Sequence, residues 1–495
     1  MTTKELLARY IREFNADDTE HYIQDIPNAN AEDWLLENAP LIDIPDKELE
    51  RIYYFRLWTF RKHIKSTPDG YVITEFLPPV PWGGRHNTII AAAGHHLSEA
   101  KWLKNCKKIV EDYVDLWLME KSNTYLYSSW IIDALYEYCS HIGDYSYGIS
   151  RLDLLVHYYE SLESKQMTRC GLFWSIDGHD AMEYSISGVN EDLVTMKGVR
   201  PTLNSYMAAN ALSISRFARI AGDNALADEY QEKHDKLVTK MNRLLWDGSF
   251  YKAIHTDELD APSFADLPSS QNVKELIGYI PWQFNLAPRG LESAFKELKD
   301  PEGFLSKHGL TTAEQRHPRY LYSADHPCLW NGYIWPFAIS QTLRSIDNLL
   351  TNYEQSVITE SDFYSILKAY ARSHYITENG KTQCWIDEVK SPVTNEWSCR
   401  SILKSAGWRA EDGGLERGKD YNHSTFCDII LGSLLGIKSQ DGKISVKPRI
   451  PDDWTYFTVD NLCIGKSCYR ITYDKTGEKY RKGISITAKT IVDKD

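Results

Sequence analysis

The hydrophobic positions of this chain recur mainly at helical spacing. The clearest case is residues 203–245, which begin with one continuous apolar face. Its apolar positions are Leu203, Met207, Ala211, Ile214 and Ala218. Gly222-Asp223 then ends this helix and caps the next one. The pattern predicts a helical hairpin, and Gly143-Asp144 after the segment 127–142 predicts a second unit of the same kind.

Most of the remaining chain also reads as helical. Residues 1–45 predict a helix followed by irregular, acidic, proline-punctuated chain, and residues 71–76 predict a short strand. The strands that a parallel sheet would need between the helices are missing, so the pattern favours a toroid of helical hairpins. Further helices are expected at 46–64, 88–104, 106–119, from Trp335-Pro336 onward, at 361–376 and at 423–436.

After Gly436 the apolar period changes from helical spacing to two. The alternation predicts a small antiparallel sheet packed on the helical body. Its expected strands lie near 443–446, 456–459, 468–473 and 483–487. We therefore expect three parts, which are an N-terminal extension packed on the barrel at 1–45, a catalytic barrel at 46–436 and a C-terminal β-sheet element at 437–495.

Charge and cysteine content exclude several classes of protein. A net charge of −13 over 495 residues disfavours nucleic acid and anionic membranes as partners. None of the nine scattered cysteines forms a CxxC pair, so we expect free thiols in a reducing compartment and no metal or redox motif.

The N-terminus has no apolar signal segment, which favours the cytoplasm, although a signal removed before residue 1 stays an alternative. We expect no cofactor and leave the oligomeric state open.

Two loops combine acidic and aromatic residues, at 174–184 and at 385–397. Pro392 prevents the second loop from continuing as a helix. Aromatic rings stack on the apolar faces of sugars, and glycosidic hydrolysis needs two carboxyl groups, one as a proton donor. We take Asp180 as the general acid and Glu388 as the general base, with Glu183 as the alternative acid.

The same loops carry a resemblance to a known family. Asp177-Gly178-His179-Asp180 and Glu388-Val389-Lys390-Ser391-Pro392-Val393-Thr394-Asn395 match the acid and base motifs of inverting glycosidases with an (α/α)6 barrel. Trp330-Asn331-Gly332-Tyr333-Ile334-Trp335-Pro336 matches the motif that lines their sugar pocket. Over residues 45–495 the chain most resembles the mannosylglycerate hydrolase-like proteins and glycoside hydrolase family 63, with trehalases more distant.

The motifs and the two loops together give a set of candidate substrate-binding residues. Where the family often has a Trp-Asp pair that binds the terminal sugar, this chain has Trp82-Gly83 followed by Arg85 and His86, so Arg85 or His86 is expected to take over recognition. The full expected set is Trp82, Arg85, His86, Trp174, Asp177, Arg200, Asn204, Trp330, Asn331, Trp335, Trp385, Glu396, Trp397 and His423.

These observations predict an inverting exo-glycoside hydrolase that removes a terminal sugar from an oligosaccharide or glycoside. Two alternatives stay open. One is a polysaccharide lyase, because helical toroids also host lyases. The other is a carbohydrate-binding scaffold without catalytic activity.

Overall fold

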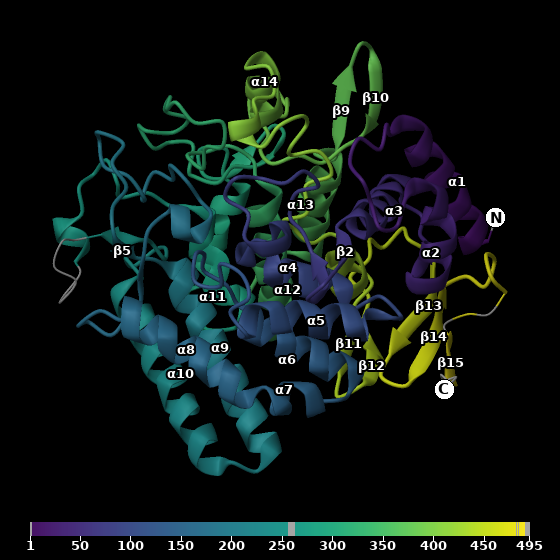
Figure 1. The fold of residues 1–495 in the computed structure, drawn as a ribbon, viewed down its shortest axis with the longest axis horizontal. Coiled ribbons are helices and arrows are strands. Elements are labelled where there is room, and N and C mark those ends of the chain that lie inside the picture. Colours follow the sequence, from purple (N-terminus) through teal and green to yellow (C-terminus); the bar gives the residue numbers. More distant parts are fainter. Residues whose placement is uncertain (1, 256–262, 482, 484, 491–495) are drawn as a thin grey trace.

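The computed structural model describes residues 2–255, 263–481, 483 and 485–490, and its fold is mainly helical (Figure 1). Its α-helices are α1 (Thr3–Asp17), α2 (Ala31–Asn38), α3 (Lys47–Lys62), α4 (Ala93–Ala100), α5 (Cys106–Leu118), α6 (Ile131–Ile142), α7 (Ser146–Ser150), α8 (Leu152–Gln166), α9 (Pro201–Ala221), α10 (Asn224–Leu244), α11 (Ile280–Gln283), α12 (Pro336–Asn352), α13 (Glu360–Arg372) and α14 (Ser398–Ser405). A π-helix, η9, spans Ile429–Leu434.

The strands are short and form several small sheets. They are β1 (Leu41–Asp43), β2 (Ile64–Thr67), β3 (Gly70–Ile73), β4 (Trp174–Ser175), β5 (Gly198–Val199), β6 (Ile254–His255), β7 (Leu305–Ser306), β8 (Gly309–Leu310), β9 (Tyr375–Glu378), β10 (Lys381–Cys384), β11 (Ile437–Gln440), β12 (Lys443–Val446), β13 (Tyr456–Ile464), β14 (Ser467–Asp474) and β15 (Ser485–Thr490). No helix in the described part of the chain has the length and apolar character needed to cross a membrane.

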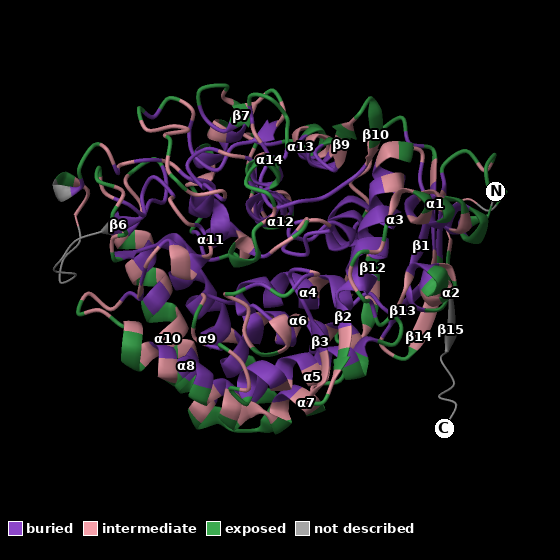
Figure 2. Cartoon of the chain, turned by 45° about the horizontal axis from the view of Figure 1, so that its top comes forward, coloured by how far each residue is buried: buried purple, intermediate pink, exposed green. Residues whose placement is uncertain are grey.

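The hairpin of α9 and α10 shows how the helices divide into inner and outer ones. Helix α9 begins with Pro201, which the first turn of a helix tolerates, and ends at Gly222 in the left-handed conformation. It is buried along most of its length, whereas α10 buries only Ala227, Tyr230, Leu237 and Met241. A helix that is buried all round lies in the core, and one with a narrow apolar stripe lies at the surface. Figure 2 shows the same contrast between buried central helices and the exposed outer faces of α7 and α10.

The inner helices contact one another in chain order, because α4 packs on α6, α6 on α9, α9 on α11, α11 on α12 and α12 on η9. Hydrogen bonds then join the residues that lead into η9 to α4 and to the residues just after it. Glu99 of α4 accepts from the backbone N–H groups of Phe426 and Asp428, and the indole of Trp102 donates to Asp428 at 2.9 Å. These contacts are consistent with a toroid.

A four-stranded antiparallel sheet in the order β1-β13-β14-β15 packs beside the helices. Its edge strand β1 comes from the N-terminal segment, where the sequence indicated only irregular chain. Strand β12 was expected to belong to this sheet. It instead pairs with β11 in a separate hairpin. The N-terminal helix and the C-terminal sheet lie on the same side of the molecule (Figure 1).

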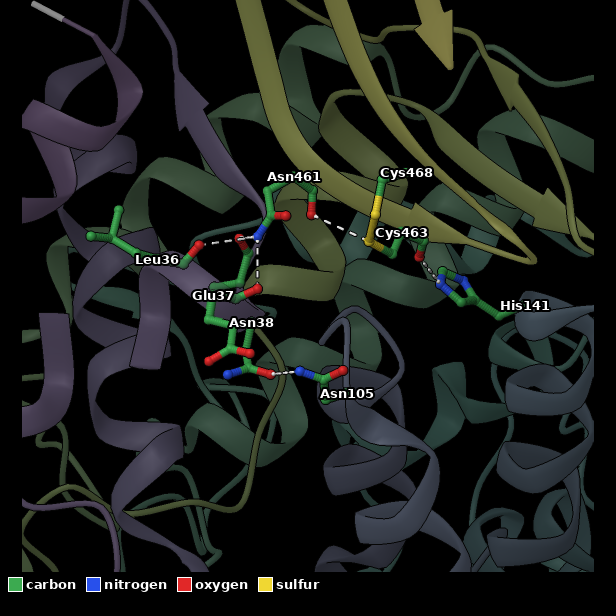
Figure 3. Close-up of a disulfide and its surroundings, with 9 residues drawn as sticks. Leu36, Glu37, Asn38, Asn105, His141, Asn461, Cys463 and Cys468 are labelled. Atoms are coloured by element: carbon green, nitrogen blue, oxygen red, sulfur yellow. Dashed lines mark hydrogen bonds between the residues drawn. A yellow bond between two sulfur atoms is a disulfide. The ribbon is translucent and has the colours of Figure 1, made fainter. Parts of the chain in front are cut away.

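The expectation that all cysteines are free is wrong for one pair. Cys463 and Cys468 face each other across the β13–β14 hairpin and form a disulfide, while the other seven are free thiols. Figure 3 shows how this hairpin is fixed to the helices. The Asn461 side chain donates to the carbonyl groups of Leu36 and Glu37, and the His141 ring contacts the Cys463 carbonyl at 3.3 Å.

The helices with clear start and stop signals are confirmed. Asp46 caps α3 through the backbone N–H groups of Glu48 and Leu49, and the Gly-Asp stop between α9 and α10 lies where the sequence placed it. The segment 361–376 ends earlier than expected, because α13 stops at Arg372 and β9 begins at Tyr375. Helices α7 and α8 follow Gly143-Asp144, where the second helical hairpin was expected, whereas α2, α11 and α14 were not anticipated.

Candidate active site

Five carboxylates from different parts of the chain line one cavity of about 620 Å³. They are Glu75, Glu183, Asp325, Glu388 and Asp412. Aromatic side chains form much of the remaining wall, as is typical of sugar pockets. These aromatic residues are Phe76, Trp82, Tyr127, Trp335 and Tyr421.

The segment 330–335 joins the two acidic loops. The Trp330 backbone N–H donates to the Glu183 carbonyl at 3.1 Å. Further along the segment, Ile334 and Lys390 exchange two backbone hydrogen bonds of 2.9 Å each. Because one short extended segment holds both loops, Glu183 and Glu388 are positioned relative to each other by backbone contacts.

Glu388 is 4% exposed and is held by donors on both carboxylate oxygens. Arg417 Nε donates to Oε1 at 2.7 Å, and the thiols of Cys328 and Cys399 donate to Oε2 at 3.0 Å and to Oε1 at 3.6 Å. Burial raises the pKa of both thiols, so that they remain protonated donors at neutral pH. The carboxylate is therefore fixed in orientation while it borders the cavity.

Glu183 has the opposite environment, because no cation is paired with it in the described structure. Burial, reinforced by the carboxylates of Asp177, Glu75 and Glu388, raises the pKa of Glu183 to about 8. At neutral pH this side chain carries a proton. The cavity thus combines a protonated carboxyl at Glu183 with a carboxylate at Glu388, the division of roles that acid/base catalysis needs.

Asp180 is placed differently from what its motif implies. Its carboxylate accepts from Ser128 at 2.6 Å, from Ser175 at 2.9 Å and from Arg200 Nε at 2.7 Å. It is 3% exposed and is not among the residues that line the cavity. A carboxylate enclosed by three donors, one of them a buried arginine, is unsuited to donate a proton to a substrate, so our proposal moves the acid role to Glu183.

Of the other expected binding residues, only Trp82, Trp335 and His423 line the cavity. Arg85 and His86 instead pair with Asp69, so they do not replace the missing family aspartate there. Glu396 is exposed, and the nearby Arg400 binds Glu416 at 2.8 Å. The residues that lie outside the cavity wall are Arg85, His86, Trp174, Asp177, Arg200, Asn204, Trp330, Asn331, Trp385, Glu396 and Trp397.

Several of these residues outside the cavity wall support the site through hydrogen bonds or ring stacking. Asp177 accepts from the backbone N–H groups of Gly178 and Tyr184, which folds the acidic loop. The side chain of Asn204, on α9, accepts from the Phe173 backbone N–H and donates to the Phe173 carbonyl. Trp330 stacks on Trp335 at 4.3 Å between ring centroids and so supports a wall residue.

The sequence reasoning missed Glu75, Arg417, Cys328 and Cys399. A signal existed for Glu75, because an acid that directly follows the apolar alternation of 71–74 falls where a buried strand ends. No comparable signal marks the others. Arg417 and Cys399 lie 29 and 11 positions from Glu388, and Cys328 lies 60 positions from it.

Cys328, Glu388 and Cys399 also form a group that could hold a metal ion. Their ligand atoms lie within 4.8 Å of one another and all three residues are buried, and zinc accepts such ligands. However, Arg417 Nη2 contacts Cys328 Sγ at 3.0 Å, and Cys399 Sγ and Glu388 Oε2 at 3.4 Å each. The guanidinium supplies the positive charge at this point, and a cation would have to displace it.

A second cavity of about 410 Å³ is lined in part by the charged residues Lys101, Glu137, Arg344 and Asp428. These four are paired with one another. Arg344 binds Glu137 and Asp428, and Lys101 binds Asp428 at 2.9 Å. None of the acids from the two loops lines this cavity, so it does not compete as the catalytic site.

The placement of Asp180 predicts that Asp180→Asn damages stability more than chemistry. Removing one charge of a buried ion pair leaves Arg200 uncompensated, and we expect a loss of about 3–5 kcal/mol in the free energy of unfolding, measured in urea. The turnover number per folded molecule stays within about tenfold of the native enzyme. Asp192→Asn, at an exposed position, is the control. Unchanged stability with a thousandfold loss of turnover would return the acid role to Asp180.

Several known proteins are similar to this chain in sequence or structure. A family model described as "Mannosylglycerate hydrolase MGH1-like glycoside hydrolase domain" matches residues 85–424. A solved structure named "Sialidase" is similar with a TM-score of 0.87 and 34% identity, covering 99% of this chain and 43% of that one. The present chain therefore spans less than half the length of that relative.

Two more distant structures are similar in fold alone. A GH78 family rhamnosidase of Bacillus sp. GL1 has a TM-score of 0.54 and 14% identity, over 88% of this chain and 40% of that one. The GH63 mannosylglycerate hydrolase from Thermus thermophilus in complex with glucose has a TM-score of 0.50 and 10% identity, over 76% of this chain and 98% of that one.

Proposed function

This chain belongs to the family described as the mannosylglycerate hydrolase MGH1-like glycoside hydrolase domain, and from that membership we propose that it is an inverting, exo-acting glycoside hydrolase. Its substrate is a terminal sugar of an oligosaccharide or glycoside. Glu183 acts as the general acid and Glu388 as the general base.

The proposal includes an (α/α)6 barrel at residues 46–436. Six outer segments alternate in the chain with six inner ones. The outer segments are α3, α5, α8, α10, η7 (Glu292–Lys299) and α13, and the inner ones are α4, α6, α9, α11, α12 and η9. The chain-order packing of the inner helices and the hydrogen bonds from α4 to the last of them support this arrangement.

In the proposed reaction Glu183 donates its proton to the oxygen of the leaving group as the glycosidic bond breaks. Glu388 takes a proton from a water molecule, whose oxygen forms the new bond to the anomeric carbon from the opposite face. The products are the free sugar with inverted configuration and the alcohol, and the two carboxyl groups regain their starting states by proton exchange with solvent. Inverting enzymes need about 6.5–9.5 Å between the two groups to admit the water.

The single observation that carries the proposal is the shared cavity of Glu183 and Glu388 with their opposite environments. The carboxyl with the raised pKa has no cation partner in the described residues, while the other is fixed by Arg417 and two thiols. Such a division of two carboxyl groups by environment is how glycosidases assign acid and base roles.

Exo action is part of the proposal, and the rings behind one part of the cavity wall support it. Trp335 and His423 line the cavity, and Phe337 and His95 are buried against the His423 ring at centroid distances of 4.4 and 6.1 Å. Rings packed behind this part of the wall would favour the binding of a chain end.

The proposal is tested by incubating the protein with a panel of aryl glycosides and plant or microbial oligosaccharides and measuring released sugar. The similar structures are named after different sugars, so the panel includes mannosides, glucosides, rhamnosides and sialosides. We expect release of one terminal sugar per cleavage. Unsaturated products absorbing in the ultraviolet would indicate a lyase, and binding without cleavage would indicate a scaffold; either result contradicts the proposal.

The pKa of Glu183 predicts the alkaline limb of the pH profile. A general acid works only in its protonated form, and burial raises this pKa to about 8. Initial rates at low substrate concentration should therefore give a kcat/KM that is insensitive to loss of this proton below pH 8 and falls about tenfold per pH unit above it. A limb that begins near the ordinary pKa of a glutamate, about 4.3, would contradict the acid role.

A further inference from the structure

Glu75 and His423 form a buried pair in the cavity wall. Glu75 Oε1 lies 3.0 Å from His423 Nδ1, and the residues are 4% and 2% exposed. Each keeps one polar atom, Glu75 Oε2 and His423 Nε2, without a hydrogen-bond partner in the described part of the protein. A buried polar atom left in that state costs about 1–3 kcal/mol. Two such atoms beside one cavity indicate a ligand that satisfies both.

The two free atoms can both bind hydroxyl groups. Nδ1 of His423 lies near Glu75 Oε1 and also contacts the Tyr421 hydroxyl. Nε2 is therefore an acceptor when Nδ1 carries the proton, and a donor when Nδ1 accepts from Tyr421. Glu75 Oε2 is an acceptor. A hydroxyl group both donates and accepts, so it satisfies either form of the histidine.

The pair is held rigidly by the backbone on both sides. Asn422 donates from its backbone N–H to the Glu75 carbonyl and from its side chain to the Thr74 carbonyl, at 3.1 Å each. His96 of α4 contacts the Asn422 carbonyl at 2.7 Å. Glu75 and His423 are thus fixed in place before any ligand arrives, which reduces the entropy that binding would cost.

The charges around the pair select against anionic ligands. Among the described wall residues, Arg417 is engaged by Glu388, and Arg409 is engaged by Asp412 at 2.7 Å. Glu75, Glu183 and Glu388 border the same space. A sugar bearing its own carboxylate would meet these groups without an unpaired cation to receive it.

We propose that Glu75 Oε2 and His423 Nε2 form hydrogen bonds with two hydroxyl groups of a neutral terminal sugar, and that this pair determines which sugar the cavity takes. The apolar faces of the sugar lie against the neighbouring aromatic walls, where Phe76 contacts both Trp82 and Tyr421. The proposal rests on the proposed function for the location of the sugar, but recognition is separable from bond cleavage.

The test measures binding of neutral monosaccharides (glucose, mannose, galactose and rhamnose) and of glucuronate and N-acetylneuraminate by titration calorimetry. We expect a neutral sugar to bind the native protein best. Glu75→Gln replaces one acceptor by a donor group and should weaken that sugar about 10–100-fold. Glu411→Gln, at an exposed site outside the cavity, should leave affinity unchanged. Preferred binding of either anionic sugar would overturn the proposal.

Deoxy sugars make the assignment specific. Among the monodeoxy analogues of the best sugar, one should bind the native protein about 10–100-fold more weakly than the parent, and Glu75→Gln should no longer distinguish that analogue from the parent. His423→Asn should abolish discrimination at a second hydroxyl and is the reserve if the Gln variant does not fold, which circular dichroism will show. Discrimination that persists in both variants would refute the assignment.

The two proposals can fail separately. If the panel shows hydrolysis but Glu75→Gln keeps its sugar preference, the recognition proposal fails and the catalytic one stands. If neutral sugars bind and the deoxy pattern holds, but no glycoside is cleaved, the catalytic proposal fails alone.

Discussion

Glu388→Gln should lower kcat by at least about 10³-fold, with little change in KM. The amide has nearly the size of the carboxylate but cannot accept the proton of the attacking water, and general-base catalysis contributes about 10²–10⁴-fold. Arg417 also loses its charged partner, so stability should fall moderately as well. Steady-state kinetics on the best glycoside, beside circular dichroism of the folded variant, measure both effects.

Two further variants separate a base from a merely structural role for Glu388. Glu388→Ala opens space beside Arg417, and sodium azide should restore part of its rate by attacking the anomeric carbon directly, giving a glycosyl azide of inverted configuration. Glu411→Gln, exposed on a neighbouring segment, should retain the native rate. If Glu388→Gln keeps more than a tenth of the native kcat, the base assignment is wrong.

Glu183→Gln should produce the second large effect, and one that depends on the leaving group. Glycosides with poor leaving groups need protonation and should slow by about 10²–10⁴-fold. Glycosides of dinitrophenol leave without help and should slow by less than about tenfold. The alkaline limb near pH 8 should also disappear, because the titrating group with the raised pKa is gone.

The contrast between the two variants is the control. Glu388→Gln should be slow on every leaving group, whereas Glu183→Gln should recover on the activated ones. An equal loss on both substrates in Glu183→Gln would assign that residue to binding or folding. In that case Asp180→Asn should be examined for the same leaving-group pattern.

Local signals in the sequence predicted the helical scaffold well. Gly222-Asp223 ends α9 and caps α10, and Asp46 starts α3, because caps act within a few residues. Strand β1 was missed because its stability comes from β13, whose paired residue Asp460 lies more than 400 positions from Leu41. A three-residue strand has little pattern of its own.

The two acidic loops singled out in the sequence border one cavity through Glu183 and Glu388, whereas Asp180 does not line it. Asp180 and Glu183 are three positions apart on one short turn, and the backbone direction there is set by Ala181 and Tyr184, both at positive φ. Which acid faces the cavity and which faces Arg200 depends on that turn. Composition and motif spacing carry no information on it.

Partners that come from elsewhere in the fold were also hidden. The sequence does not show that Glu75 lies beside His423, or that Arg417 and the two thiols hold Glu388. Conversely, Arg85 and His86 were placed in the site by a gap in the family motif, but Asp69 binds both. A missing residue in a motif does not identify its replacement.

The most direct measurement of the central claim is proton NMR of the sugar released in the first minutes of reaction, before mutarotation. Two carboxyl groups that act on opposite faces of the sugar, one on the leaving oxygen and one through water, yield the anomer opposite to that of the substrate. A first product with the substrate's own anomeric configuration would mean a covalent intermediate on the enzyme and would contradict the roles given to Glu183 and Glu388.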